Sequence, residues 1–155
     1  MINITVLAVG KVKDRWLQAG IDEYVKRLGR YAKVKLITLP DSPDHLGEDE
    51  ILKREGEQIL KRVPKRGFRV LLDLGGEQPD SVALADKLGT WAVKGDGHIV
   101  FIIGGSHGLA DDVRARADYR LTLSEMTFTH LMTKLILLEQ IYRAFRIRSN
   151  EPYHK

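Results

Sequence analysis

The 155-residue sequence predicts an α/β fold, in which one mostly parallel sheet carries helices on both faces. Apolar runs of strand length alternate with stretches whose apolar residues recur every three or four positions. The run "HIVFII" places five large apolar side chains in a row, which is typical of a strand buried on both sides. No repeat, low-complexity tract or linker interrupts the pattern, so residues 1–155 are expected to form a single domain.

The first segment, residues 2–9, is a nearly continuous aliphatic run and predicts a buried strand. Asp14 follows it at a position suited to cap a helix, and the next apolar residues are spaced by threes and fours. Residues 34–39, "VKLITL", predict the second strand. The inward face of the intervening helix is expected to consist of Leu17, Ile21, Tyr24, Val25 and Leu28.

A polar loop with two prolines, "PDSPDHLG", leads to a charged amphipathic helix over residues 48–63. One face of this helix is expected to be solvated, because its charged residues gather there. Residues 68–74 then predict the third strand, and residues 81–93 the third helix. The apolar face of the 48–63 helix comprises Ile51, Leu52, Ile59, Leu60 and Val63.

The last third of the chain predicts a strand over 98–103, a short helix over 111–117, a strand over 119–124 and a long helix over 131–147. Apolar residues cover more than one face of the long helix. We therefore expect a second subunit to cover what the sheet does not, which makes the protein a homodimer. A monomer with an exposed apolar patch is the alternative. The residues concerned are Leu131, Met132, Leu135, Ile136, Leu138, Ile141, Tyr142 and Phe145.

Composition narrows the function classes. Twenty-five Lys and Arg residues against twenty-one Asp and Glu give a formal charge of +4, which suits a polyanion such as nucleic acid, although a surface that serves only solubility would look the same. Cysteine is absent, which excludes disulfides and thiolate catalysis. Neither a membrane span nor a targeting segment is evident, so a soluble, cytoplasmic protein is expected.

Three glycines follow the fourth predicted strand in "IIGGSHGL". Ligands of open α/β sheets bind beyond the carboxyl ends of the strands, where glycine lets backbone amides approach them closely. A tight turn without a ligand is the alternative. The motifs GxGxxG, GxxxxGK[ST] and GxSxG, typical of dinucleotide sites, phosphate loops and hydrolases, are all missing. The glycines therefore predict a ligand site of another type.

The segments "FIIGGSHGL", "LTLSEMTFTHLMTKLILLEQIYRAFRI" and "PYHK" together resemble the ribosomal large-subunit methyltransferase H family of small SPOUT enzymes. "ITVLAVGKVKD", "EYVKRLGRY" and "REGEQIL" extend the resemblance over the whole chain. It implies S-adenosylmethionine-dependent methylation of N3 of a pseudouridine in 23S ribosomal RNA, by a homodimer whose carboxyl half forms a deep trefoil knot. The sequence departs from the family at Thr129, where proline is usual, and at Lys134, where arginine is common.

The resemblance also implies a cofactor site at the third strand, the glycine turn and the segment after the fifth strand. Gly104 would leave room for ligand atoms, and the apolar members would enclose the adenine and shelter the sulfonium from water. Taken alone, Leu72 and Leu123 could be strand core, and Met126 or Phe128 could plug the base of the last helix. The implied cofactor-binding residues are Leu72, Gly104, Leu123, Ser124, Glu125, Met126, Thr127 and Phe128.

A sulfonium methyl is already activated, so the enzyme must align the reactants and handle the proton on N3. His154 and His130 are the candidate proton acceptors, and Arg143 is the candidate cation for charge that develops on the ring oxygens. His130 could instead cap a helix, and Arg143 could hold a phosphate or a carboxylate such as Glu139. Neither a metal-ligand cluster nor a carboxylate pair is evident, so no metal is expected.

The terminal "NEPYHK" carries Tyr153, suited to stack on a base, and His154. The tail is either a disordered end or a segment that crosses to the partner's cofactor, as the family resemblance favours. A basic surface around the last helix predicts phosphate contacts and a folded ribosomal particle as substrate. A non-enzymatic RNA-binding module and a nucleotide hydrolase are the rival functions. The basic residues are Lys134, Arg143, Arg146, Arg148 and Lys155.

Overall fold

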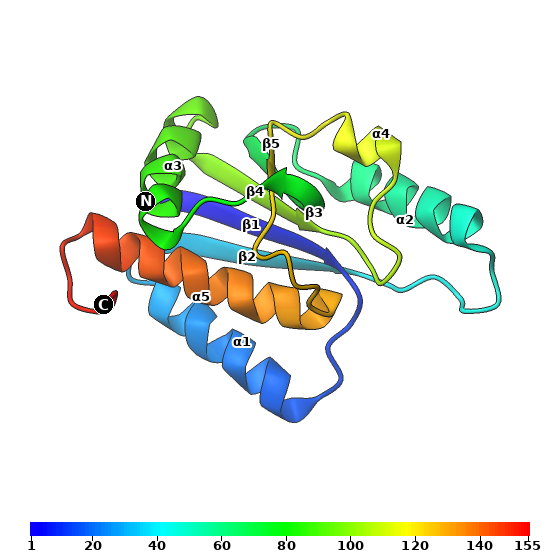
Figure 1. Ribbon diagram of the computed structural model, residues 1–155, viewed down its shortest axis with the longest axis horizontal. Helices are drawn as coiled ribbons and strands as arrows, with labels where there is room; N and C mark the ends of the chain where they lie inside the picture. Colours follow the sequence, from blue (N-terminus) through cyan, green and yellow to red (C-terminus); the bar gives the residue numbers. More distant parts are fainter.

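The computed structural model describes residues 1–155 and confirms the α/β fold class, with a five-stranded sheet that is parallel throughout (Figure 1). The strand order is β2-β1-β4-β3-β5, so β4 lies at the centre, as its apolar sequence predicts. The elements are β1 Ile2–Val9, α1 Arg15–Leu28, β2 Ala32–Leu39, α2 Glu48–Arg62, β3 Phe68–Glu77, α3 Ser81–Lys94, β4 His98–Ile103, α4 Asp111–Arg114, β5 Tyr119–Leu121 and α5 His130–Arg148.

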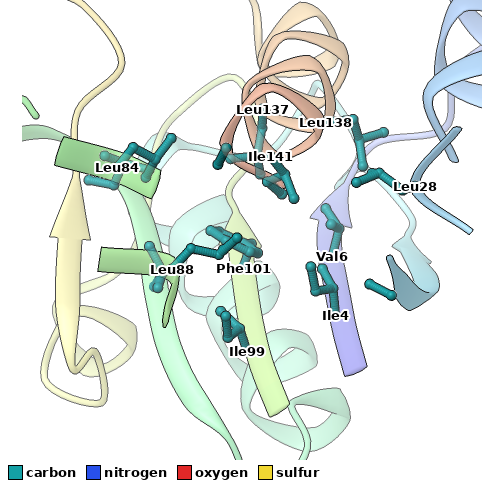
Figure 2. Close-up of a cluster of buried hydrophobic side chains, with 14 of the residues drawn as sticks. Ile4, Val6, Leu28, Leu84, Leu88, Ile99, Phe101, Leu137, Leu138 and Ile141 are labelled. Carbon is teal, nitrogen blue, oxygen red and sulfur yellow. The ribbon is translucent and has the colours of Figure 1, made fainter. Parts of the chain in front are cut away.

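Helices cover both faces of the sheet, because alternate strand residues point to opposite sides and both sets are apolar. Helices α1, α3 and α5 pack on one face, and α2 and α4 on the other. Figure 2 shows Ile141 of α5 above Phe101 of β4, with Leu138 facing Leu28 of α1. Each such fully buried side chain stabilises the fold by about 2 kcal/mol relative to an exposed one.

Two predicted elements end earlier in the structure, and one predicted cap is absent. The fifth strand stops at Leu121, because β3 bulges after Leu72 and the ladder resumes only at Glu77. The short fourth helix ends at Arg114. Asp14 occupies the position before α1, but its side chain makes no capping hydrogen bond.

The apolar residues around α5 are mostly covered within the single chain, which differs from the explanation predicted. Helix α5 lies between α1 and α3, and these neighbours cover the sides of the helix that the sheet does not reach. Leu138, Ile141 and Phe145 are buried within the single chain, whereas Leu131 and Leu135 are only half-buried. Apolarity around the helix therefore does not by itself require a second subunit. None of the helices has the length and apolar run needed to cross a bilayer.

Candidate functional site

The glycines after β4 form a compact turn at the carboxyl edge of the sheet. The amide of Gly108 donates to the carbonyl of Gly105 at 3.0 Å, and Gly108 has a φ of +87°. A Cβ on Gly104 would lie 2.5 Å from the Gly108 carbonyl oxygen and 2.8 Å from Leu109 Cγ. The tight turn is therefore real, and the space that Gly104 leaves free is filled by the turn itself rather than held open for a ligand.

Leu72 lies at the end of the regular part of β3 and is nearly buried. The next residue, Asp73, has a side chain only 5% exposed, and it pairs with Arg114 Nε and Arg120 Nη2, both at 2.8 Å. Thr122 donates its hydroxyl to the Asp73 carbonyl at 2.6 Å and accepts from the Gly76 amide at 2.7 Å. This network fixes the strand end that precedes the implied cofactor segment.

The segment after β5 is more exposed than expected for residues that enclose an adenine. Leu123 packs partly against the core and Phe128 is half-buried, but Glu125, Met126 and Thr127 are exposed. Met126 is 73% exposed, so it does not plug the base of α5. Ser124 makes a local bond, because its hydroxyl accepts from the Met126 amide at 3.0 Å.

Helix α5 begins beside this segment, and Thr129 caps it. The Thr129 hydroxyl accepts from the Met132 amide at 3.2 Å, so the residue that departs from the family pattern has a structural role there, and His130 is not the cap. Lys134, the other departure, is buried, and burial lowers its pKa. Lys134 is therefore wrong as a member of the basic surface.

A polar pocket of about 390 Å³ opens at the same edge, between β1, β2 and the glycine turn. Glu55 of α2 reaches it from one face of the sheet, and His130 of α5 from the other. Nε2 of His130 lies 3.7 Å from the nearer oxygen of Asp41. The lining residues are Lys13, Asp41, Ser42, Pro43, Asp44, Ile51, Glu55, Ser106, His107 and His130.

The terminal tail follows a defined path back along its own α5. The Tyr153 hydroxyl donates to Glu139 at 2.7 Å, and its ring lies over the Arg143 guanidinium with 4.7 Å between the guanidinium carbon and the ring centroid. Arg143 contacts Glu139 at 3.2 Å and His154 Nδ1 at 3.2 Å. Burial first, and then bonds to Tyr24 and Glu139, raise the pKa of Tyr153, so its hydroxyl stays protonated near neutral pH.

A second set of contacts anchors the residues just before Tyr153. Glu151 accepts from Arg146 Nη1 at 2.6 Å and from the Tyr31 hydroxyl at 2.7 Å, and Arg30 lies 3.2 Å from the same carboxylate. Arg146 also donates to the Pro152 carbonyl at 2.9 Å. The basic residue Arg146 is therefore used within the tail, which leaves it less available for phosphate.

The two groups of predicted site residues lie at opposite ends of α5 (Figure 1). The implied cofactor residues lie at the carboxyl edge near His130, whereas Arg143, Tyr153 and His154 cluster around the far end. The 19 residues of α5 span roughly 28 Å at 1.5 Å per residue. A single chain therefore brings the members of each group together but does not join the two groups.

Sequence reasoning missed several residues that organise these two places. Asp73 follows an apolar strand run directly, which is a usable signal for a functional edge in a parallel sheet. Glu55 carries a weaker signal, because it falls between the apolar positions of an amphipathic helix and yet is only 6% exposed. Nothing in the sequence pattern indicated that Thr122 would bond to both Asp73 and Gly76 in the bulge of β3.

The edge fits the adenosine and methionine parts of S-adenosylmethionine in its chemistry. Leu72 and Leu123 are apolar residues of the strand ends, Phe128 is half-buried, and the polar pocket contains buried polar atoms without partners, at Glu55 Oε1 and His130 Nε2. The pocket is lined in part by Ser106 and His107 of the glycine turn. Apolar side chains and a polar pocket at one edge of the sheet suit a ligand with an aromatic and a charged end.

Comparison with known proteins agrees with this chemistry. The family described as "Predicted SPOUT methyltransferase" matches residues 2–154. The chain is 53% identical to a ribosomal RNA large subunit methyltransferase H of Alkaliphilus oremlandii (strain OhILAs) and 48% identical to one of Clostridioides difficile (strain 630), and each alignment covers 99% of this chain and 100% of the relative. A solved structure, that of a probable methylase family protein from Haemophilus influenzae Rd KW20, shares the fold with a TM-score of 0.51 and 16% identity, over 99% of this chain and 70% of that one. The chain belongs to the SPOUT methyltransferase family.

Proposed function

We propose that this methyltransferase transfers a methyl group from S-adenosylmethionine to N3 of a pseudouridine in 23S ribosomal RNA. The family match and the relatives named as ribosomal RNA large subunit methyltransferase H support the substrate class. The substrate is the RNA within a ribosomal particle in the cytoplasm, because one small domain offers limited surface for recognising a sequence alone.

The separation of the two site groups along α5 carries the proposal that the enzyme acts as a homodimer. A two-fold axis perpendicular to α5 would pair it with its copy in antiparallel orientation, because rotation about such an axis reverses the helix direction. The far end of one α5 then lies near the start of the other. The tail residues Arg143, Tyr153 and His154 of one subunit thereby reach the glycine turn of its partner.

Exposed apolar side chains on the α1 and α5 side support such an interface. Trp16 of α1 is 63% exposed, and Leu131, Met132 and Tyr142 of α5 remain half-buried in the single chain. Large apolar side chains that stay exposed together on one side of a domain often mark a surface that contacts another protein. A second subunit would complete the burial that α1 and α3 begin.

In the proposed site, Leu72, Leu123 and Phe128 hold the adenosine beside the turn, together with Gly104, Ser124, Glu125, Met126 and Thr127. When bound, S-adenosylmethionine supplies a methyl group already activated by its sulfonium. The protein must therefore place the base, stabilise charge on its carbonyl oxygens and remove the N3 proton. These three tasks fall to the tail cluster.

Arg143 and Tyr153 are suited to the charge that develops on the base. Arg143 is a permanent cation, and the raised pKa of Tyr153 keeps its hydroxyl a donor. Glu139 holds both groups, since it accepts from the Tyr153 hydroxyl and from Arg143 Nη2. Arg143 is thereby oriented before the substrate arrives and has further N–H groups to donate, which lowers the cost of reorganisation in the transition state. The one hydroxyl proton of Tyr153 is engaged with Glu139 and reaches the base only when that bond is released.

His154 is the proposed proton acceptor, and its contact with Arg143 regulates that role. A guanidinium only donates, so Nδ1 accepts the 3.2 Å bond from Arg143, and the neutral ring carries its proton on Nε2. His154 thus has no free acceptor while this bond persists. When Arg143 moves its donor to a carbonyl oxygen of the base, Nδ1 becomes free to take the N3 proton.

The proposal is tested by incubating the purified protein with labelled S-adenosylmethionine and ribosomal particles that lack the modification. We expect label on N3 of a pseudouridine in 23S RNA, at least about tenfold faster on particles than on a short naked hairpin, with a rate that falls as salt rises. Binding to the particles without label transfer would make the protein an RNA-binding module and overturn the proposal. Equal rates on hairpin and particle would refute the need for a large substrate.

A further inference from the structure

The polar pocket between β1, β2 and the glycine turn contains none of the residues that the family resemblance implies for the cofactor. It is nevertheless a neighbour of that site, because Ser106 and His107 belong to the turn that Gly104 begins. An elongated ligand bound beside this turn can therefore extend into the pocket.

Two glycines open this edge to side chains from both faces of the sheet. Ala8 and Ile103 are paired in the ladder, and Gly10 and Gly105 each follow two residues later. A Cβ on Gly10 would lie 2.6 Å from His130 Nε2, and one on Gly105 would lie 2.8 Å from Glu55 Oε1. Because neither glycine has a side chain, His130 and Glu55 can occupy the space above the strand ends.

Each of these two side chains keeps a buried polar atom without a partner. Glu55 is only 6% exposed, and while Oε2 accepts from the Ser42 amide at 3.2 Å, Oε1 accepts from nothing. Nε2 of His130 also lacks a hydrogen bond. Buried polar atoms without partners are few in folded proteins, and a ligand with donors of its own would account for Glu55.

The charges around the pocket define the kind of ligand. Asp41, Asp44 and Glu55 contribute carboxylates, and Lys13 contributes an ammonium, with the imidazole of His107 beside them. Three acids against one permanent cation attract a cationic group. The ammonium of Lys13 can at the same time bind an anionic group. An α-amino acid is a ligand that carries a cationic and an anionic group a few bonds apart.

We propose that this pocket binds the amino-acid end of S-adenosylmethionine, with the α-ammonium at Glu55 and Asp41 and the α-carboxylate at Lys13. The inference rests on the proposed function, because it assumes that the adenosine part lies beside Leu72 and Leu123. The glycine turn then lies between the apolar side chains proposed for the adenine and the charged pocket for the amino acid. Charge-assisted bonds to a buried carboxylate favour ligands that carry the ammonium over those that lack it.

The test measures dissociation constants by calorimetry for S-adenosylmethionine, S-adenosylhomocysteine and 5′-methylthioadenosine, which lacks the amino-acid end. The variant is Glu55→Gln, which keeps the side-chain shape and an oxygen for the Ser42 amide but removes the charge. We expect binding of the first two ligands to weaken by about tenfold or more, and binding of methylthioadenosine to change by less than about twofold.

Two further variants keep the test decisive. Glu57→Gln, on the exposed face two residues along α2, should leave all three constants unchanged. Asp41→Asn changes a side chain that is 56% exposed, so the fold does not depend on it, and it should weaken the first two ligands by about threefold. This second pocket variant decides the matter if Glu55→Gln does not fold.

Equal losses for all three ligands, or no loss, would overturn the inference. A loss confined to S-adenosylmethionine would also overturn it, because the pocket would then respond to the sulfonium rather than to the ammonium. Unchanged cofactor binding with slower methylation would assign the pocket to the RNA base instead. Failure of the unmodified protein to bind S-adenosylmethionine would overturn the proposed function itself, and the inference with it.

Discussion

The two ends of α5 differ in how their carboxylates are bonded. At the far end, Tyr153, Glu139, Glu151 and Arg146 are bonded to one another or to α1 and the loop after it, so the tail is held by its own chain. At the near end, the pocket holds buried acceptor and imidazole atoms without partners. The far end also keeps two buried atoms without partners, the Nε groups of Arg143 and Arg146, but the oxygens of its carboxylates Glu139 and Glu151 are all bonded. Bonded carboxylates fix a segment in place, whereas a buried carboxylate oxygen without a partner is available to a ligand.

This difference agrees with the roles proposed for the two ends. In the proposal, the near end receives the cofactor and leaves polar atoms open for it, whereas the far end fixes its groups before the substrate arrives. In a chain of 155 residues the two sets of residues lie a whole helix apart, and the proposed homodimer would bring them together.

The change with the largest expected effect removes the tail and leaves the pocket intact. Deleting Tyr153 to Lys155 should lower methyl transfer by about two orders of magnitude or more, because charge stabilisation and proton transfer are lost together. Folding, dimer formation and the dissociation constant for S-adenosylmethionine should hardly change, because these residues lie far from the glycine turn of their own chain and, in the proposed dimer, act on the substrate base rather than hold the cofactor. Single-turnover rates and calorimetry on the same preparation give both values.

Mixed dimers then show which chain the tail serves. The tail-deleted chain is combined with a full-length chain carrying Gly104→Val, whose dimer state and melting temperature are checked first. If the tail crosses the interface, each mixed dimer regains one working site from the intact turn of one chain and the tail of the other. Inactive mixed dimers would show that the tail acts within its own chain, against the proposed shared site.

A substitution in the glycine turn should have a smaller effect. In Gly104→Ala the new Cβ meets the Gly108 carbonyl and Leu109, so the turn has to shift, and affinity for S-adenosylmethionine should fall by about tenfold. Gly47→Ala is the matched control, because a Cβ there meets nothing within 4 Å. Equal affinity of the Gly104 and Gly47 variants in calorimetry would remove the turn from the binding site.

The sequence predicted the fold well, because hydrophobic spacing and burial are local signals. Strands 2–9 and 98–103 and the bounds of the long helix follow from such patterns, to within one residue. The bulge in β3 does not, because it depends on Thr122, which lies far along the chain from Asp73 and binds its carbonyl. The buried position of Lys134 was equally invisible, since a lysine in a helix is ordinarily solvated.

The candidate site was predictable in its parts but not in its arrangement. The motifs around Gly104 and His154 could be identified from the chain alone by their resemblance to a family. Their placement at opposite ends of α5 required the structure, because it depends on which way the last helix runs across the sheet. Glu55 and Asp73 needed the structure as well, since a carboxylate is recognised as buried only when its neighbours are known.

The smallest expected effect concerns the anchoring of the tail as a function of pH. The hydrogen bond from Tyr31 and the charges of Arg146 and Arg30 lower the pKa of Glu151 below its ordinary value of 4.5. A lowered pKa means that the carboxylate stabilises the folded tail above about pH 4.5, and that this contribution is lost as the pH falls through the folded value. The near end of α5 has no part in this equilibrium.

Backbone order parameters from NMR should therefore stay near 0.85 for Leu137 and Ile141 as the pH is lowered from 7 to about 3.5, while that of Tyr153 drops toward about 0.6. Glu151→Gln should show the loosened tail already at neutral pH, because it retains the acceptor oxygen but not the charge that Arg146 and Arg30 require. A tail that stays equally ordered across this range, in both proteins, would mean that the Tyr153 contacts to Glu139 and Arg143 hold it without Glu151.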